Sequence, residues 1–224
     1  MKMNKNAILA AIALLSTMTG CRHGMEVTNL SKYDAETMPS LLKKELTVLL
    51  SCPNNSELSS RVAMRLRDFG GYNVYTDIFQ GAEKSDMRIE VLSENAEGTA
   101  DWTNFFVCMP GCLLFTHAWL GYGYRYDMKW RIRATDLNTD QLVFDRPVDV
   151  SLEFRYARPG TTWGNVTGVC LLGIIWPVIN GVIVESYDDK ATPELMEKVK
   201  EALAKHFAFE ILKNVDSAMN AANR

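Results

Sequence analysis

The chain has 224 residues, with 24 lysines and arginines against 27 aspartates and glutamates, for a net charge of −3. This balance excludes nucleic acid as a partner, because binding to a phosphate backbone needs a basic excess. Hydrophobic residues make up 47% and charged residues 23%, which is typical of a globular domain and excludes a disordered chain.

The N-terminal segment has the organisation of a signal peptide. Lys2 and Lys5 precede the apolar run AILAAIALL at residues 7–15. This run is shorter than the roughly 20 residues of a membrane-spanning helix, but it matches the core of a signal peptide. It leads to Met18-Thr19-Gly20-Cys21 and not to an A-x-A-like cleavage site. We therefore expect a signal peptide over residues 1–20, and its removal brings the net charge to about −5.

This motif resembles the lipobox of bacterial lipoproteins, in which an apolar residue and two small residues precede a cysteine. The resemblance implies that the Cys21 sulfur receives a diacylglyceryl group, that cleavage precedes Cys21, and that the new amino terminus takes an acyl chain such as palmitate. Met18 departs from the leucine that is usual at its position. Arg22 stands where lipoproteins of the inner membrane often have aspartate, which implies the outer membrane with the protein facing the periplasm. The alternative is an ordinary signal peptide with a chance cysteine.

The segment after Cys21 begins with a polar stretch. We expect residues 21–43 to form the lipidated N-terminus and a spacer, and residues 44–224 to form a single periplasmic α+β domain. The residues at 45–52 predict a strand that stops at the turn Pro53-Asn54-Asn55.

A helix is expected next, with Ser56 as its cap and Gly70-Gly71 as its end. Its apolar face would consist of Leu58, Val62, Leu66 and Phe69. Strands are expected within 72–79 and 86–94. In element order alone, residues 45–94 resemble the small α/β domains of envelope-assembly lipoproteins. This resemblance implies a non-catalytic role and assigns no site residue.

A long β-hairpin is the clearest structural pattern. Alternate residues from Tyr122 to Arg133 are apolar, the turn DLNTDQ follows, and alternation resumes from Val148 to Tyr156. The buried face would carry Tyr124, Tyr126, Met128, Trp130 and Ile132 on one strand and Val148, Val150, Leu152, Phe154 and Tyr156 on the other.

The chain closes with a predicted helix. Thr192 suits its cap, Pro193 its first turn, and the buried stripe would be Leu195, Val199, Leu203, His206 or Phe207, and Ile211. The predicted fold class is α+β: a mixed or antiparallel sheet with a strand-helix-strand-strand start, a long β-hairpin and a C-terminal packing helix.

Two uncharged segments, 104–124 and 161–184, flank the hairpin. Proline and glycine interrupt both, so neither suits a membrane-spanning helix. Three interpretations remain open. The segments form core elements, they lie on the membrane surface through their tryptophans, or they contact another copy or an envelope partner.

The cysteines permit disulfides, because Cys52, Cys108, Cys112 and Cys170 would lie in an oxidising compartment. Cys108 and Cys112 are the candidate pair, and two buried thiols are the alternative. The spacing of Cys108, Cys112 and His117 is not a common zinc pattern, so we predict neither a metal site nor a cofactor.

A cationic stripe on the hairpin is a candidate anion-binding face for lipid head groups or peptidoglycan carboxylates; it consists of Arg125, Lys129, Arg131 and Arg133. Asp127, Asp149 and Glu153 share that face, so cross-strand ion pairs are the competing interpretation.

The sequence contains no nucleophile with a recognisable base, and it has only 3 histidines. We therefore expect no enzyme activity. The expected function is a membrane-anchored lipoprotein that acts in envelope assembly, scaffolding or maintenance through contacts with an envelope protein or with another copy of itself. The alternative is a binding protein or sensor for an apolar or anionic envelope ligand.

Overall fold

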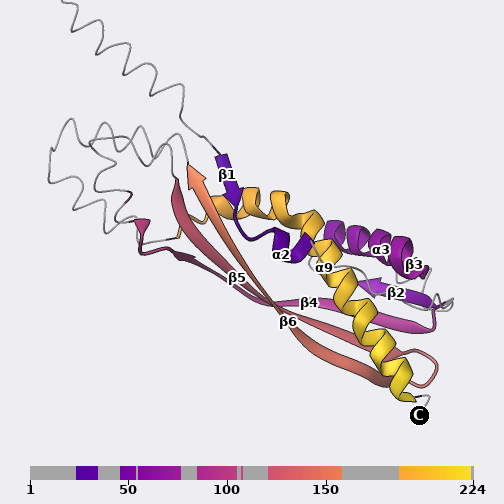
Figure 1. The fold of residues 1–224 in the computed structure, drawn as a ribbon. Helices are drawn as coiled ribbons and strands as arrows, with labels where there is room; N and C mark the ends of the chain where they lie inside the picture. The colour runs from indigo at the N-terminus through magenta and orange to yellow at the C-terminus, as the bar shows by residue number, and fades with distance from the viewer. Residues whose placement is uncertain are drawn as a thin grey trace, which may run out of the picture. The chain divides into compact units, whose positions relative to one another are not determined.

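The computed structural model describes residues 24–34, 46–53, 55–76, 85–104, 107, 121–157 and 187–222. These ranges contain a six-stranded sheet in the order β1-β6-β5-β4-β2-β3 (Figure 1). The elements are β1 Gly24–Val27, α2 Ser31–Asp34, β2 Thr47–Ser51, α3 Ser56–Gly70, β3 Asn73–Tyr75, β4 Met87–Ala100, β5 Tyr122–Asp136, β6 Gln141–Ala157 and α9 Ala191–Ala222. The sheet is mixed, since β1 runs antiparallel to β6 while β2 runs parallel to β3 and β4. The predicted α+β class is confirmed.

The chain divides into two compact units. The first consists of residues 1–27, 98–125 and 153–191, and the second of residues 28–97, 126–152 and 192–224. Strands β4, β5 and β6 each contribute residues to both units.

In the first unit, a small aromatic cluster lies on the sheet. The ring of Tyr124 packs against Phe154 and Tyr187, with centroids 5.5 and 5.6 Å apart. A Cβ atom at Gly98 would come within 2.4 Å of the Tyr187 ring. Only glycine therefore lets this ring lie directly against the backbone of β4.

The described part of the predicted spacer, residues 24–34, is folded. In the first unit, β1 pairs with β6, with Gly24 opposite Ala157. In the second unit, the Tyr33 hydroxyl donates to the Ser151 carbonyl and accepts from the Ser151 N–H, both at 2.9 Å. Met25 and Tyr33 are 6% and 2% exposed. These two buried side chains account for the departure from a polar spacer.

The second unit begins with β2 and α3. The cap of α3 is Asn55 and not the predicted Ser56, because the Asn55 Oδ1 accepts a hydrogen bond from the Leu58 N–H at 2.9 Å. The helix ends as predicted: Gly71 has a φ of 66° and its N–H donates to the Arg67 carbonyl. Left-handed backbone of this kind favours glycine.

The buried face of α3 includes Leu58, Val62 and Leu66, as predicted, but Phe69 is 39% exposed. The predicted strand within 72–79 is the short β3, of which residues 73–75 are described. The strand predicted at 86–94 continues to Ala100. Residues 93–97 are exposed in β4, which explains why no alternation marks them.

The hairpin is confirmed. β5 and β6 flank a turn at 137–140, and of the predicted apolar set only Tyr126 and Tyr156 are half-buried instead of buried. The closing helix begins at Ala191, one residue before the predicted cap Thr192, and all of it from Thr192 on belongs to the second unit. The residues of its stripe are at most 1% exposed: Leu195, Val199, Leu203, Phe207 and Ile211. His206 is buried beside them, at 9% exposed.

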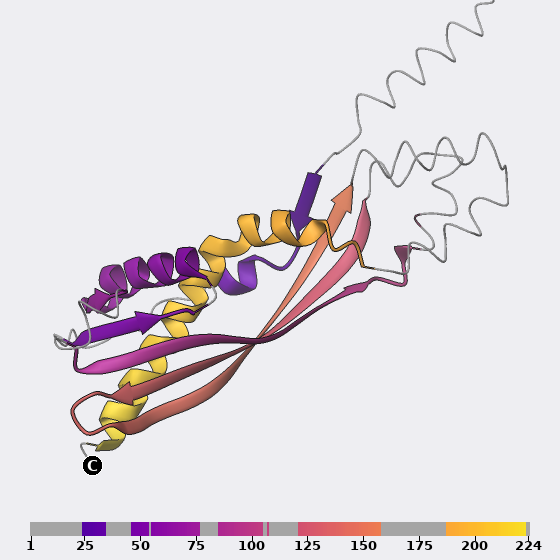
Figure 2. The same cartoon turned by 180° about the vertical axis from the view of Figure 1, so that it is seen from behind.

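Helices α3 and α9 lie side by side on one face of the sheet in both views (Figures 1 and 2). The Arg61 guanidinium donates to the Glu201 carboxylate at 3.0 Å and so joins the two helices. The rings of Trp130 on β5 and Phe207 on α9 pack at 5.0 Å between their centroids. Among the described residues, no helix is long and apolar enough to cross a membrane.

The Ile211→Ala substitution tests this packing. Ile211 is 0% exposed, so its truncation leaves a cavity under α9 and should lower the free energy of unfolding by about 3 kcal/mol. Urea unfolding followed by circular dichroism measures the change. The matched control is Leu142→Ala, at a side chain 58% exposed, which should change stability by less than about 0.5 kcal/mol. Equal losses for both variants would contradict the assigned packing.

Candidate functional site

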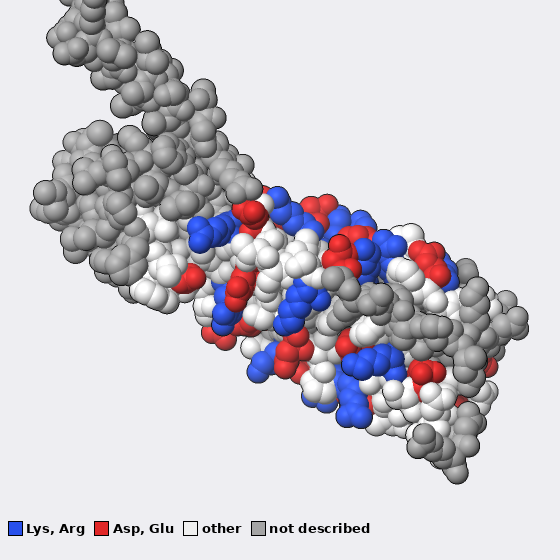
Figure 3. All heavy atoms as spheres, viewed as in Figure 1, with Lys and Arg blue, Asp and Glu red and all other residues white. Residues whose placement is uncertain are grey.

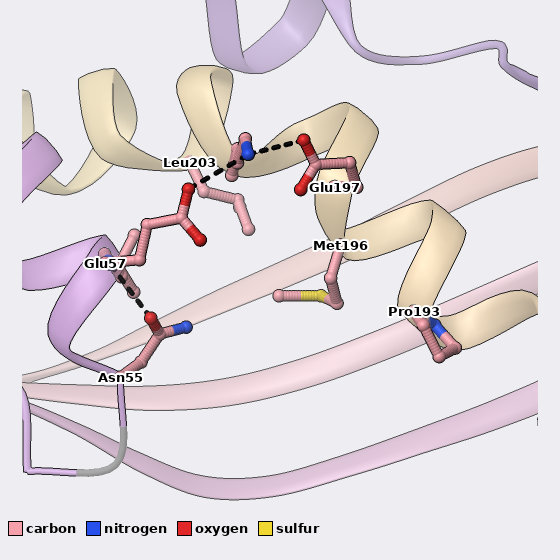
Figure 4. A pocket seen from close by; sticks show the side chains of 8 residues that line it. Asn55, Glu57, Pro193, Met196, Glu197 and Leu203 are labelled. Atoms are coloured by element: carbon pink, nitrogen blue, oxygen red, sulfur yellow. Dashed lines mark hydrogen bonds and ion pairs between the residues drawn. The ribbon is translucent and has the colours of Figure 1, made fainter.

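Two adjoining hollows lie in the second unit. The larger hollow, of about 240 Å³, is open on one side and is lined by the loop after β2, by β4 and β5, and by Met196 of α9. The smaller hollow, of about 130 Å³, lies between the first turns of α3 and α9 (Figure 4). Asn55 and Met196 line both hollows. They therefore form one candidate site with two chemically different parts.

Local sequence positions the shared residues. Cys52 and Pro53 leave the end of β2, and Asn55 turns the chain into α3 by capping it. Met196 lies one residue after the fully buried Leu195, which holds the first turns of α9 in place. The hollows therefore form where two helices begin above the same strands.

The smaller hollow is polar at its mouth. The Lys200 ammonium donates to the Glu57 carboxylate at 2.9 Å and also to Glu197, as the dashed lines of Figure 4 mark. Hydrogen bonds from Lys200 and then Arg61 lower the pKa of Glu57, while Glu197 and Glu57 raise the pKa of Lys200. Since both carboxylates already hold the ammonium, this hollow offers no uncompensated positive charge.

The larger hollow is mainly apolar. Its lining side chains are those of Cys52, Pro53, Asn55, Val91, Leu92, Ser93, Ala96, Tyr126, Met128, Trp130 and Met196. None of them is charged. Trp130 is 6% exposed, and among the described residues its indole Nε1–H has no hydrogen-bond partner. The nitrogen itself is buried from solvent, so Trp130 contributes apolar ring surface to the hollow.

Cys52 lines the larger hollow as a free thiol. Burial raises the pKa of this thiol from 9.0 to about 11, although a hydrogen bond with Ser59 acts in the opposite direction. Thiolate is the nucleophilic form of cysteine, so a raised pKa makes Cys52 unreactive at neutral pH. The Cys52 side chain therefore meets the hollow as a neutral thiol.

Three predicted site residues lie outside the described residues: the lipid-attachment residue Cys21 and the candidate disulfide pair Cys108 and Cys112. The uncharged segments 104–124 and 161–184 also lie largely outside them. At the described end of the first segment, in the first unit, Asn104 is buried and its side-chain N–H donates to the Gly123 carbonyl at 2.8 Å.

The candidate anion-binding face is divided between the two units. In the first unit, Arg125 pairs with Glu153 at 2.9 Å. In the second unit, the Asp145 carboxylate lies 3.4 Å from Arg131 and 3.3 Å from Arg133, and Arg131 also pairs with Glu94. Within the described part of the chain, Lys129 is the one cation of the four without an ion pair.

Cross-strand ion pairs of the kind that the sequence also allowed are thus present at three of the four cations. The face shown in Figure 3 likewise mixes positive and negative side chains. Paired guanidinium groups attract an external anion less than free ones do, because the neighbouring carboxylate offsets their charge.

The two hollows were not predicted from the sequence. It placed Met128 and Trp130 on the buried face, which is correct, but Cys52 and Met196 gave no sign of lining a common space.

Comparisons with known proteins do not place the chain in a family. No protein-family model matches the chain. A search of curated proteins finds no match either.

Among solved structures, the chain is similar to a DUF330 protein from Xanthomonas campestris, at 12% identity and a TM-score of 0.43, over 81% of this chain and 92% of that one. It is also similar to a minor lipoprotein from Acinetobacter baumannii, at 8% identity and a TM-score of 0.34, over 76% and 92% of the two chains. Rare lipoprotein B from Shewanella oneidensis matches at 13% identity and a TM-score of 0.30, over 68% and 98%. These scores are too low to assign a function.

The reactivity of Cys52 tests the environment of the larger hollow. A pKa of about 11 instead of 9.0 lowers its thiolate fraction about 100-fold near neutral pH. Iodoacetamide at about pH 8 should therefore modify the Cys52 peptide about 100-fold more slowly in the folded protein than in urea, as measured by mass spectrometry. Equal rates would contradict the assigned burial.

The same shift sets the sign of a pH effect. The folded state binds more protons at Cys52 than the unfolded state does between about pH 9 and 11. The contribution of this thiol to stability is therefore complete below pH 9 and is lost as the pH rises toward 11.

Proposed function

We propose that this protein is a non-catalytic bacterial envelope lipoprotein. Fatty chains on the Cys21 sulfur hold it in the outer membrane, and its folded part faces the periplasm. The observation that carries the proposal is Met18-Thr19-Gly20-Cys21 directly behind a short apolar run. A thioether to lipid needs a sulfur nucleophile, so this cysteine cannot be replaced by serine. Several acyl chains, at about 0.8 kcal/mol per buried CH₂, make the anchor effectively permanent.

The proposed role is assembly, scaffolding or maintenance of the envelope through protein contacts. The chemistry of the candidate site supports a non-catalytic protein, because its thiol is protonated at neutral pH and its lysine is held by two carboxylates. The partner is an envelope protein or a second copy of the chain.

The Cys21→Ser substitution tests the anchor. Without the sulfur no diacylglyceryl group is added, so the protein should leave the outer-membrane fraction, as measured by immunoblotting of fractionated cells. Cys52→Ala is the matched control, since it removes another cysteine and should leave the protein in the membrane. Unchanged fractionation of Cys21→Ser would refute the lipid anchor.

Photocrosslinking in intact cells tests the contact role. A photoreactive phenylalanine at Leu142, which is 58% exposed, reports on neighbours of the hairpin turn in the second unit. We expect discrete adducts that disappear when Cys21→Ser is added, because the unanchored protein no longer meets its partner. Adducts that persist unchanged in the unanchored variant, or their complete absence at several exposed positions, would count against a contact role in the envelope.

A further inference from the structure

The folded part of the first unit begins almost directly after the proposed lipid-attachment residue. Arg22 and His23 alone separate Cys21 from Gly24, the first residue of β1. β1 belongs to the sheet, because Gly24 lies opposite Ala157 of β6. Since a chain spans at most about 3.6 Å per residue, covalent geometry keeps the Cα atom of Cys21 within about 11 Å of that of Gly24. A lipid anchor at Cys21 therefore leaves this end of the sheet little freedom to move away from the bilayer.

The same end of the sheet includes the turn that follows β4. The start of β1, the end of β6 and the start of β5 lie side by side in both views (Figures 1 and 2). Gly121, just before β5, lies against β6, because a Cβ atom there would come within 3.1 Å of the Tyr156 carbonyl carbon. The Asp101 N–H, just after β4, donates to the Gly123 carbonyl at 2.9 Å. With neighbouring strands about 4.8 Å apart, this turn lies about 15 Å across the sheet from β1.

Hydrogen bonds hold the turn after β4 in one conformation, and it presents a tryptophan. The Asp101 carboxylate accepts from the Thr103 N–H at 2.9 Å. The side chain of the buried Asn104 donates to the Gly123 carbonyl at 2.8 Å and accepts from the Gly123 N–H at 2.6 Å. Between these fixed points, Trp102 is 73% exposed, the highest value for a large apolar side chain among the described residues. The fold therefore holds this ring out toward its surroundings.

We propose that the first unit docks on the bilayer that holds the Cys21 lipid, with the Trp102 indole at the interface between head groups and acyl chains. This inference rests on the proposed lipid anchor and adds which surface meets the membrane. Tryptophan favours that interface, because its ring is apolar while its N–H can still reach water or head-group oxygens. The short tether brings lipid, and not a protein, within reach of this end of the sheet.

Charge limits how deeply the turn enters. Asp101 is exposed directly beside Trp102, and an ionised carboxylate is costly to place in hydrocarbon. The turn therefore reaches the head-group boundary and goes no deeper.

The test uses the full lipidated chain, labelled with fluorotryptophan, in nanodiscs of phosphatidylethanolamine and phosphatidylglycerol. The Trp102 fluorine signal is assigned by its loss in Trp102→Phe. A phospholipid that carries a nitroxide near its head group is then added to the nanodiscs. It should broaden the Trp102 signal beyond detection, because a nearby unpaired electron accelerates relaxation.

Leu142→Trp provides the matched control. It adds an indole at an exposed position, since Leu142 is 58% exposed, at the start of the strand whose other end pairs with β1. The signal that this variant adds should remain sharp with the same nitroxide lipid, because exposure alone does not bring a ring to the bilayer.

The tether is tested by its length. A glycine-serine segment of about twenty residues, inserted between His23 and Gly24, has a root-mean-square span of about 25 Å. The first unit can then leave the bilayer, so the Trp102 signal should return. The same segment added after Arg224 should leave the broadening unchanged.

Three outcomes would overturn the proposal: a sharp Trp102 signal in the anchored chain, loss of the Leu142→Trp signal as well, or equal broadening with either added segment. The mass of the N-terminal peptide is measured on the same samples. A sharp Trp102 signal on a chain that carries lipid would refute the docking and leave the anchor standing. A chain without lipid would refute the anchor, and the docking with it.

Discussion

The burial of one stripe of α9 against the sheet is the constraint on which the second unit depends. Five side chains of this stripe are at most 1% exposed. They cover apolar side chains of β5 and β6 that would otherwise be exposed to water. At about 25 cal/mol per Å² of apolar surface, this burial outweighs the ion pairs between α3 and α9, since exposed pairs contribute about 0–1 kcal/mol each. The ion pairs that Arg61 and Lys200 make between α3 and α9 orient the two helices relative to each other. The apolar stripe holds α9 on the sheet.

The hollows follow from the same arrangement. The first turn of α9 and the start of α3 approach the strands from different directions, and the side chains there are a capping asparagine, a proline and a flexible methionine. Farther along α9, Phe207 and Ile211 are fully buried. The site thus lies where the packing between the starts of these two helices and the strands is incomplete.

Much of the fold was predictable because side-chain periodicity reports directly on burial. Strict alternation from Tyr122 and from Val148 gave both strands of the hairpin, and the spacing of Leu195, Val199 and Leu203 gave the helix that covers them. The cap of α3 was misplaced by one residue because Asn55 and Ser56 are both good caps, and only the hydrogen bond to the Leu58 N–H distinguishes them.

Other features left no such pattern. β1 has four residues in a polar stretch, and its strand character comes from pairing with β6, which is distant in sequence. The exposed half of β4 lacks alternation because neither of its faces is buried. The hollows were unpredictable for a related reason: a cavity depends on what neighbouring elements fail to fill, and no local pattern records this. The cationic stripe was visible in the sequence, but its pairing with Glu94 and Asp145 required the strand register.

The proposed function places the folded units at a membrane through a single covalent group, so the chemical state of Cys21 decides it. Mass spectrometry of the N-terminal peptide from protein isolated in its native host is the most direct measurement. We expect a chain that starts at Cys21 and carries the mass of a diacylglyceryl thioether with an amide-linked acyl chain. A chain that starts elsewhere, or one with an unmodified thiol at Cys21, would contradict it.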